Sequence, residues 1–140
     1  MKRIAPHLTR GPDEPLNEQL RAFYDRLLRI LRQPVLCDGE WQLLESAPAW
    51  EGNWTHDCFI AFGWQGAGAE RLIVAVNYAA NHSQCHIRLP FADLSGKQWR
   101  LRDQLTPGEF AWSGDDLSAK GLFLDMAPWQ ACVFSMTTEA

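Results

Sequence analysis

The sequence predicts an all-β fold, an antiparallel Greek-key β-sandwich of about seven to eight strands preceded by one amphipathic α-helix. Two observations predict it. Apolar residues recur at helical spacing up to Leu31, and after Pro34 they alternate with polar residues in short runs separated by Gly, Pro, Asn and Asp. A chain of 140 residues is expected to form one domain. We expect a tail at 1–12, the helix at 13–33 and the sandwich at 34–140, with one compact domain over 13–137.

The helix is expected to begin at the acidic residues Asp13 and Glu14, with Pro15 in its first turn. It should end near Leu31, because Pro34 disfavours helical geometry at the residue before it. An isolated helix of this length is marginal in water, so its apolar stripe should pack on a sheet, lie at a sheet edge or form a homodimer. This helix stripe, the predicted interaction face, consists of Leu16, Leu20, Phe23, Tyr24, Leu27, Leu28 and Leu31.

Short segments with strand patterns follow the helix. The segment 71–78 is apolar on both faces, so it should be a central strand. The segments 83–89 and 98–103 alternate apolar and polar residues, as half-exposed antiparallel strands do. The last two segments should form a hairpin around Ala127 and Pro128. The expected strands lie at 41–45, 58–64, 71–78, 83–89, 98–103, 109–112, 122–126 and 129–136.

Composition argues against some classes of partner. A formal net charge of −4 and a pI near 5.5 argue against a nucleic-acid surface, which is normally basic. No apolar run approaches the roughly 18 residues that a membrane-spanning helix needs. The cysteines Cys37, Cys58, Cys85 and Cys132 lack the spacing of a metal knuckle. As free thiols they favour a cytoplasmic location, and disulfide pairing stays open as the alternative.

No group of residues in the sequence predicts catalysis, a metal site or a cofactor. The adjacent Asp115 and Asp116 would point to opposite faces of a strand or be solvated in a turn. Asp103 and Asp125 lie in strand patterns, where we expect them to pair with a neighbouring strand. The sequence lacks a nucleophile elbow and a dinucleotide-binding motif, and its histidines fit no common zinc spacing. These histidines are His7, His56, His82 and His86.

Several motifs occur in an order that resembles one protein family. The helix at 14–31 contains the pairs Phe23-Tyr24 and Leu27-Leu28, and a later strand ends in Val76-Asn77-Tyr78 before a turn. The segment 99–105 then has the pattern Trp-x-Leu-x-Asp-x-Leu. Over residues 14–136 this order resembles the C-terminal part of an α-amylase-family enzyme, glycoside hydrolase family 13. In that family, the last helix of a (β/α)8 barrel leads into an all-β domain.

The resemblance implies a non-catalytic accessory domain that caps or stabilises the catalytic barrel of an α-amylase-like glycoside hydrolase. The catalytic carboxylates of the family lie on barrel strands, upstream of all the motifs found here, and a retaining glycosidase needs two of them across the scissile bond. No residue of this sequence matches those positions. We therefore expect that the chain itself is not an enzyme and that its partner is the barrel of the parent protein.

The seven tryptophans suggest a further role, because indole faces stack on sugar rings. Trp50, Trp54 and Trp112 lie in loops or in a weak strand and are the candidates for an exposed carbohydrate-binding platform. Two alternatives therefore stay open, a starch- or glucan-binding module and a free-standing interaction domain that uses the helix stripe. The tryptophans expected in the core are Trp41, Trp64, Trp99 and Trp129.

Overall fold

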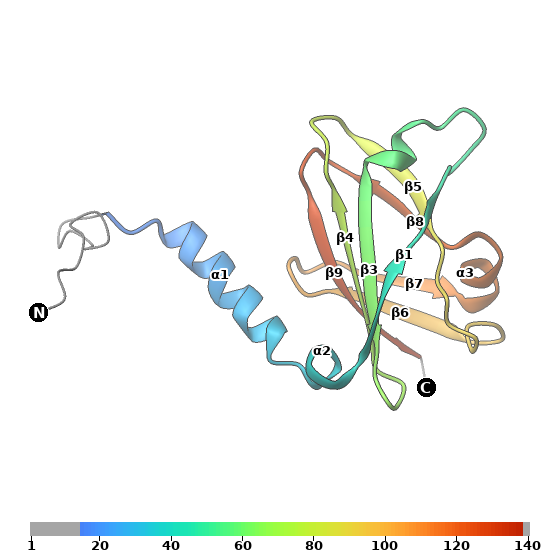
Figure 1. Cartoon of the computed structure of the whole chain (residues 1–140), viewed down its shortest axis with the longest axis horizontal. Helices are drawn as coiled ribbons and strands as arrows, with labels where there is room; N and C mark the ends of the chain where they lie inside the picture. The colour runs from blue at the N-terminus through green and yellow to red at the C-terminus, as the bar shows by residue number, and fades with distance from the viewer. Residues whose placement is uncertain (1–14, 139–140) are drawn as a thin grey trace, which may run out of the picture.

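The computed structural model describes residues 15–138, which form two antiparallel sheets packed face to face and a helix that extends away from them (Figure 1). The expected tail at 1–12 and the residues Asp13 and Glu14 lie outside the described residues. The larger sheet has six strands in the order β1-β3-β4-β9-β6-β7, and the smaller sheet has three in the order β2-β5-β8. The predicted antiparallel β-sandwich is confirmed.

The elements have the following bounds. The larger sheet contains β1 (Glu40–Leu44), β3 (Phe59–Gln65), β4 (Arg71–Asn77), β6 (Gln98–Asp103), β7 (Glu109–Ser113) and β9 (Ala131–Thr138). The smaller sheet contains β2 (Ser46–Ala47), β5 (Ser83–Ile87) and β8 (Leu122–Met126). The helices are α1 (Glu18–Leu31), α2 (Pro34–Asp38), the short 3-10 helix η2 (Thr55–Cys58) and α3 (Gly114–Lys120).

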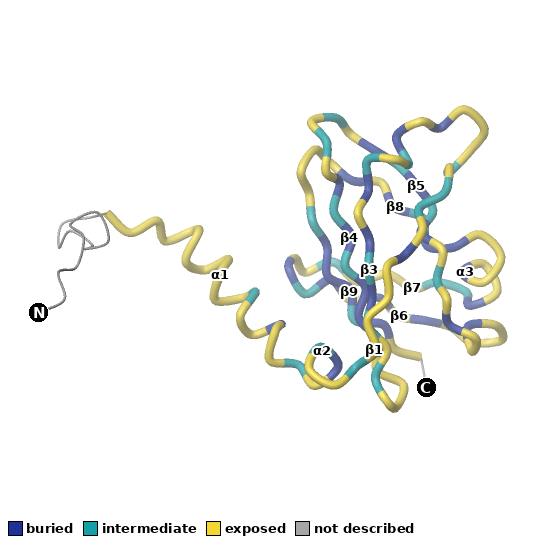
Figure 2. The backbone as a smooth tube through the Cα atoms, viewed as in Figure 1, coloured by how far each residue is buried: buried dark blue, intermediate teal, exposed yellow. Residues whose placement is uncertain are grey.

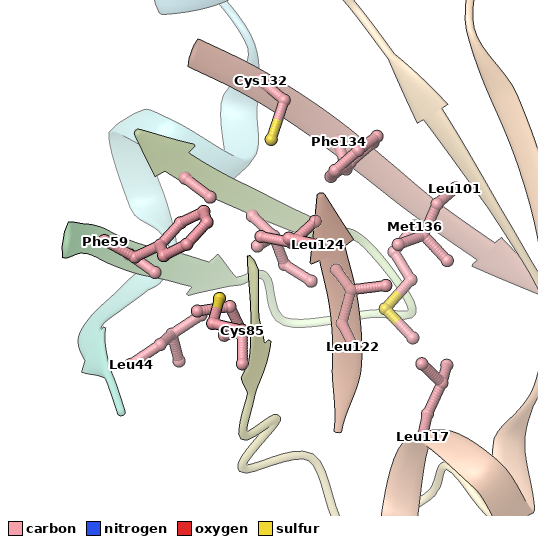
Figure 3. Packing of buried hydrophobic residues seen from close by; sticks show 14 of the residues in the cluster. Leu44, Phe59, Cys85, Leu101, Leu117, Leu122, Leu124, Cys132, Phe134 and Met136 are labelled. Carbon is pink, nitrogen blue, oxygen red and sulfur yellow. The ribbon is translucent and has the colours of Figure 1, made fainter. Parts of the chain in front are cut away.

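The hydrophobic core lies between the two sheets (Figure 3). Ile73 and Ala75, on the central strand β4, are completely buried, as the apolar pattern of this segment predicts. Trp99 is also buried, and its indole Nε1 donates a hydrogen bond to the Leu94 carbonyl at 3.0 Å. The side chains labelled in the figure are Leu44, Phe59, Cys85, Leu101, Leu117, Leu122, Leu124, Cys132, Phe134 and Met136.

Arg71, at the start of β4, is a buried cation beside this core. Its guanidinium carbon lies 4.7 Å from the ring centroid of Phe91 and 4.8 Å from that of Trp99. Its Nη2 lies 2.6 Å from each carboxylate oxygen of Asp93. The hydrogen bond from Arg71 lowers the pKa of Asp93 below its ordinary value. This pair ties the segment between β5 and β6 to the larger sheet.

The helix α1 begins later than the sequence suggests and ends where it predicts. The side chain of Asn17 accepts a hydrogen bond from the Leu20 amide at 3.1 Å and caps the helix, so Pro15 lies before the first turn. At the other end, Gln33 has an extended backbone with ψ of 136° and precedes Pro34, which opens α2. The restriction that proline places on the preceding residue therefore separates the two helices.

The helix stripe is mostly exposed, which corrects the expectation that it packs on a sheet (Figure 2). Only the last turns of α1 touch the sandwich. Leu27 and Ile30 pack, with Val35 of α2, against Leu72 and Val133 of the larger sheet. The earlier turns extend beyond the sheet, so no part of the described chain covers them (Figure 1).

Several connections differ from the sequence-based expectation, since α2 lies in the expected link after α1, and β2 and η2 lie in the expected loop at 46–57. The segment after β7 forms α3, with Asp115 and Asp116 in its first turn, where negative charge suits the helix dipole. Asp115 Oδ1 also accepts a hydrogen bond from the Gly96 amide at 3.0 Å. The expected hairpin at Ala127 is wrong, because β8 and β9 belong to different sheets. Trp129, with φ of 59°, lies in the connection that crosses between them.

Candidate functional site

The face of the larger sheet that points away from the smaller sheet is apolar over β1, β3 and β4. Strand residues alternate between the two faces, and the outward set here is as hydrophobic as the inward set. Trp41 is 54% exposed, Leu43 63% and Ile60 45%. We call this surface the outer apolar face, and its residues are Trp41, Leu43, Ile60, Phe62, Trp64, Val74 and Val76.

Aromatic contacts connect the residues of the outer apolar face. Trp41 lies opposite Trp64 in the antiparallel register of β1 and β3, and Leu43 lies opposite Phe62. The ring centroid of Phe62 is 6.3 Å from that of Trp41 and 5.5 Å from that of Trp64. Cross-strand aromatic pairs of this kind stabilise a sheet. Trp64 and Val74 also pack against the end of α1 and α2, whereas Trp41, Leu43 and Ile60 stay exposed, so the outer apolar face is ordered and only partly covered.

A second aromatic pair continues this surface beyond the strand ends. Tyr78 directly follows β4, and Trp129 precedes β9; their ring centroids lie 5.4 Å apart in an edge-to-face arrangement. Both side chains are exposed. A positive φ is uncommon for a bulky residue, so the turn holds the Trp129 backbone in a conformation that the isolated residue does not favour. Trp41, Trp64 and Trp129 were all expected in the core. This expectation is wrong for Trp41 and Trp129, which are exposed, and Trp64 is half-buried.

The helix α1 leaves the sandwich next to this face. Arg26 Nη1 donates a hydrogen bond to the Leu105 carbonyl at 2.5 Å, and the side chains of Gln33 and Gln104 are hydrogen-bonded to each other. These contacts and the packing of Ile30 fix the end of the helix on the larger sheet. The end of α1 is thus fixed beside the outer apolar face, and the earlier turns of the helix extend away from the sandwich (Figures 1 and 2).

The other half of the same face is polar. The outward residues of β6, β7 and β9 include Arg100, Arg102 and Glu109, and Arg100 Nε lies 2.9 Å from a Glu109 carboxylate oxygen. Arg26 and Arg102 border a cavity of about 670 Å³ between the helix and this half of the sheet. A partner domain that covered the outer apolar face would therefore contact polar residues and arginines along one edge of that face.

The three tryptophans predicted to form a sugar platform are not brought together. Trp50 and Trp54 are exposed on the loop between β2 and η2, whereas Trp112 belongs to β7. Trp112 is half-buried and lines a mostly apolar cleft of about 310 Å³ between β7 and β8. The structure therefore leaves one pair of candidates, Trp50 and Trp54, on a common loop.

The titratable residues considered for chemistry have structural partners. Asp103 accepts hydrogen bonds from the amides of Leu105 and Val133 and from the Thr106 hydroxyl. Asp125 accepts hydrogen bonds from His82 Nε2 at 2.5 Å and from the Gln84 side chain at 3.1 Å. Within residues 15–138, no group of three or more His, Cys, Asp or Glu side chains is arranged to hold a metal ion. None of the described helices is both long and apolar enough to cross a membrane.

All four cysteines are free thiols. Cys85 and Cys132 lie in the core between the sheets, and burial raises the pKa of each to about 12. At neutral pH they are therefore protonated, and they act as small apolar side chains. Cys37 on α2 is exposed, and Cys58 at the end of η2 is partly buried.

Comparisons with known proteins give likenesses in structure alone. No protein-family model matches the chain, and no curated protein matches it in sequence. One similar solved structure is described as a putative α-N-acetylgalactosaminidase from Bacillus halodurans. The two structures superimpose with a TM-score of 0.48 at 10% sequence identity, and the match covers 74% of this chain and 22% of that chain. Another is a family 27 β-L-arabinopyranosidase from Geobacillus stearothermophilus in complex with arabinose, with a TM-score of 0.49 at 11% identity, covering 74% and 21%. This chain thus matches about a fifth of the length of either glycosidase.

Proposed function

We propose that this chain is the non-catalytic C-terminal β-domain of an α-amylase-like glycoside hydrolase and that it stabilises the catalytic barrel of that enzyme. The uncovered apolar surface, made of the helix stripe and the outer apolar face, is the observation that carries the proposal. The order of the motifs from 14 to 136 supports the family. Because both likenesses to solved glycosidases have TM-scores below 0.5, the proposal does not rest on them.

The exposed apolar residues of the helix stripe and of the outer apolar face suit a partner domain. Contiguous exposed apolar patches rimmed by polar residues mark interaction sites. Burying a large apolar side chain is worth roughly 1.5–3 kcal/mol, so a partner that covers several of these residues gains substantial free energy. A helix that ends on the sheet and projects from it would extend into that partner. This is the arrangement expected where the last barrel helix leads into the β-domain.

The proposal is tested by co-expressing this chain with the coding region directly upstream of Met1, as one polypeptide. We expect that region to encode a (β/α)8 barrel whose midpoint of thermal unfolding is higher with the intact β-domain. Leu43→Asp with Phe62→Asp should remove most of this gain, because it places two carboxylates in the apolar interface. Trp54→Ala, outside the outer apolar face, is the matched control and should keep the gain.

Two results would contradict the proposal. The first is an upstream region that encodes no barrel. The second is hydrolysis of a chromogenic maltooligosaccharide by this chain alone, which would require catalytic carboxylates within it.

The helix stripe could instead be covered by a second copy of this chain, as in a homodimer. Size-exclusion chromatography at two protein concentrations separates the cases, since a dimer that Leu20→Gln and Leu28→Gln abolish would favour a free-standing interaction domain.

A further inference from the structure

The loop between β2 and η2 holds two large aromatic side chains in solvent. Trp50 is 53% exposed and Trp54 is 69% exposed. Indole rings are among the costliest side chains to leave in water, and they are enriched at binding surfaces. The two tryptophans are four residues apart, on one surface loop with no strand between them.

The backbone of this loop is fixed from inside. Asn53, between the two tryptophans, is buried; its Oδ1 accepts a hydrogen bond from the Ala49 amide at 3.1 Å, and its Nδ2 donates to Thr55 Oγ1 at 2.9 Å. The Asn53 amide donates to the Trp50 carbonyl at 3.1 Å and closes a turn. Gly52 in this turn has φ of +83°, a region that favours glycine.

The same network attaches the loop to the sandwich. Thr55 Oγ1 accepts a hydrogen bond from the Gln84 amide of β5 at 3.0 Å. His56 Nδ1 donates to the Asn53 carbonyl at 2.8 Å, and Ser46 Oγ donates to the His56 carbonyl at 2.9 Å. Side-chain hydrogen bonds thus hold both ends of the loop. Such preorganisation lowers the entropy that a ligand must overcome on binding.

The loop lies away from the surface assigned to the barrel. It follows β2 of the smaller sheet, whereas the outer apolar face is on the opposite side of the larger sheet. In Figure 1 the loop is at the upper right, and α1 extends to the left. A domain seated on the outer apolar face would therefore leave Trp50 and Trp54 in solvent.

The charges around the loop select the chemistry of the ligand. Between residues 45 and 58 the sequence has three carboxylates, Glu45, Glu51 and Asp57, and no Lys or Arg. Arg88 and Lys120 line a cavity beside residues 47–49, so the surroundings of the loop contain charges of both signs and do not form a cationic patch for a polyanion. Carboxylates accept hydrogen bonds from hydroxyl groups, and indole faces stack on the C–H faces of pyranose rings. These groups together suit a neutral, hydroxyl-rich ligand with flat apolar faces.

From this geometry we infer that the Trp50–Trp54 loop is a binding platform for a neutral α-glucan chain. The platform itself follows from the loop and its charges, whereas the choice of α-glucan rests on the proposed function. Each indole would stack on one glucosyl unit of the chain. The two contacts are joined by a rigid turn, so both form with little further ordering of the protein.

The test is affinity electrophoresis of the full chain in native gels that contain amylopectin, with titration calorimetry against maltoheptaose. We expect retarded migration and binding that becomes about tenfold weaker for each of Trp50→Ala and Trp54→Ala. Trp41→Ala is the matched control, because Trp41 is an equally exposed tryptophan on the outer apolar face, and it should leave binding unchanged. Asn53→Ala should weaken binding although both indoles remain, because it releases the turn.

The inference is overturned if the wild-type chain migrates freely in amylopectin, or if the double variant Trp50→Ala, Trp54→Ala binds as tightly as the wild type. Equal retardation in β-glucan and mannan gels would overturn the choice of α-glucan. Circular dichroism of each variant shows whether it is folded. If the wild-type chain stabilises the barrel but does not bind glycan, only this inference is rejected. If it binds glycan but does not stabilise a barrel, only the proposed function is rejected.

Discussion

Single buried polar residues fix the connections of this sandwich. Asn77, at the end of β4, is completely buried, and its Nδ2 lies within hydrogen-bonding distance of the carbonyls of Asn81, Met126 and Ala127. It therefore joins the end of a central strand to two loops that cross between the sheets. The Val76-Asn77-Tyr78 pattern that resembles the α-amylase family has a physical reason here, since a buried carbonyl without a donor is costly.

We predict that Asn77→Asp destabilises the chain by about 3 kcal/mol at neutral pH, because an ionised carboxylate only accepts hydrogen bonds and would face three carbonyl oxygens. Asn77→Ala should cost less, because it removes the donor without adding a charge. Urea unfolding followed by circular dichroism measures both. Equal stability of the Asp variant and the wild type would show that Nδ2 does not hold these loops.

The Arg71–Asp93 pair makes the stability of the chain dependent on pH. The folded pKa of Asp93 lies below its ordinary value of 3.8, so ionised Asp93 stabilises the folded state above that pH. As the pH falls, this contribution to the free energy of unfolding begins to be lost near 3.8, the ordinary pKa of Asp93. It is fully lost once the pH has passed below the lowered pKa of Asp93 in the folded state. We predict that Asp93→Asn lowers the thermal midpoint at pH 7 and that the difference from the wild type narrows towards pH 2. A difference that stayed constant over this range would exclude the pair as its origin.

At the scale of elements, α1 behaves as two different segments. Its last turns are part of the fold, because Leu27 and Ile30 pack on the larger sheet and Arg26 is bonded to the Leu105 carbonyl. Its earlier turns have the amphipathic pattern of a buried helix, but their apolar residues are in solvent. A helix is stabilised mainly by packing of its apolar face, so the first part of α1 has little to hold it in the free chain.

Substitutions along α1 should therefore have unequal effects. Leu20→Gln and Leu28→Gln should change the free energy of unfolding of the free chain by no more than about 0.5 kcal/mol each, as for other exposed positions. Ile30→Ala should cost about 2–3 kcal/mol, because it opens a space in packed apolar surroundings. Chemical denaturation of dilute protein separates the two classes. A large loss for Leu20→Gln would mean that the stripe is already covered.

Limited proteolysis should show the same division. Trypsin has a site at Arg21 in the exposed first part of α1, whereas Arg26 and Arg29 lie in the turns that pack on the sheet. Local unfolding exposes segments with few buried contacts first. We predict cleavage after Arg21 before cleavage after Arg26 or Arg29 and before any cleavage of the sandwich, with fragments identified by mass spectrometry. Protection of Arg21 in the free chain would contradict an uncovered first part of the helix.

At the scale of the whole molecule, the two sheets are unequal. Three strands of the smaller sheet cover part of the inner face of a six-stranded sheet, and within residues 15–138 only the end of α1 and α2 lie on the outer face. Trp41, Leu43 and Ile60 of the outer apolar face are therefore left exposed, beside the exposed helix stripe. The Trp50–Trp54 loop is on the other side of the molecule, so the proposed surface for a protein and the proposed surface for a glycan do not overlap.

The folded free chain should bind a hydrophobic dye such as ANS, because its outer apolar face is accessible in the native state. Leu43→Lys with Ile60→Lys should reduce the dye fluorescence and leave the cooperative unfolding transition intact, since both side chains are largely exposed. Fluorescence titration at a temperature well below the transition provides the measurement. Dye binding that these substitutions do not change would place the exposed apolar area elsewhere.

The sequence by itself determined the approximate positions of eight strands and of α1, because local period and turn residues carry that information, whereas β2, α2 and η2 were not predicted. The segments 98–103 and 122–126 match β6 and β8 residue for residue. The helix α3 was missed, although Asp115 and Asp116 in its first turn and Lys120 in its last were a possible signal.

Only the tertiary structure decided which face of each strand is inside. On β3 the small residues Ala61 and Gly63 point into the core, and the large Phe62 and Trp64 point outward. A period of two separates the faces of a strand, but it cannot assign them when both are apolar, because that choice depends on which layer packs against the sheet. Trp99 and Trp41 have similar strand patterns, yet Trp99 faces the smaller sheet and Trp41 faces solvent, since the described chain has no second layer to cover it.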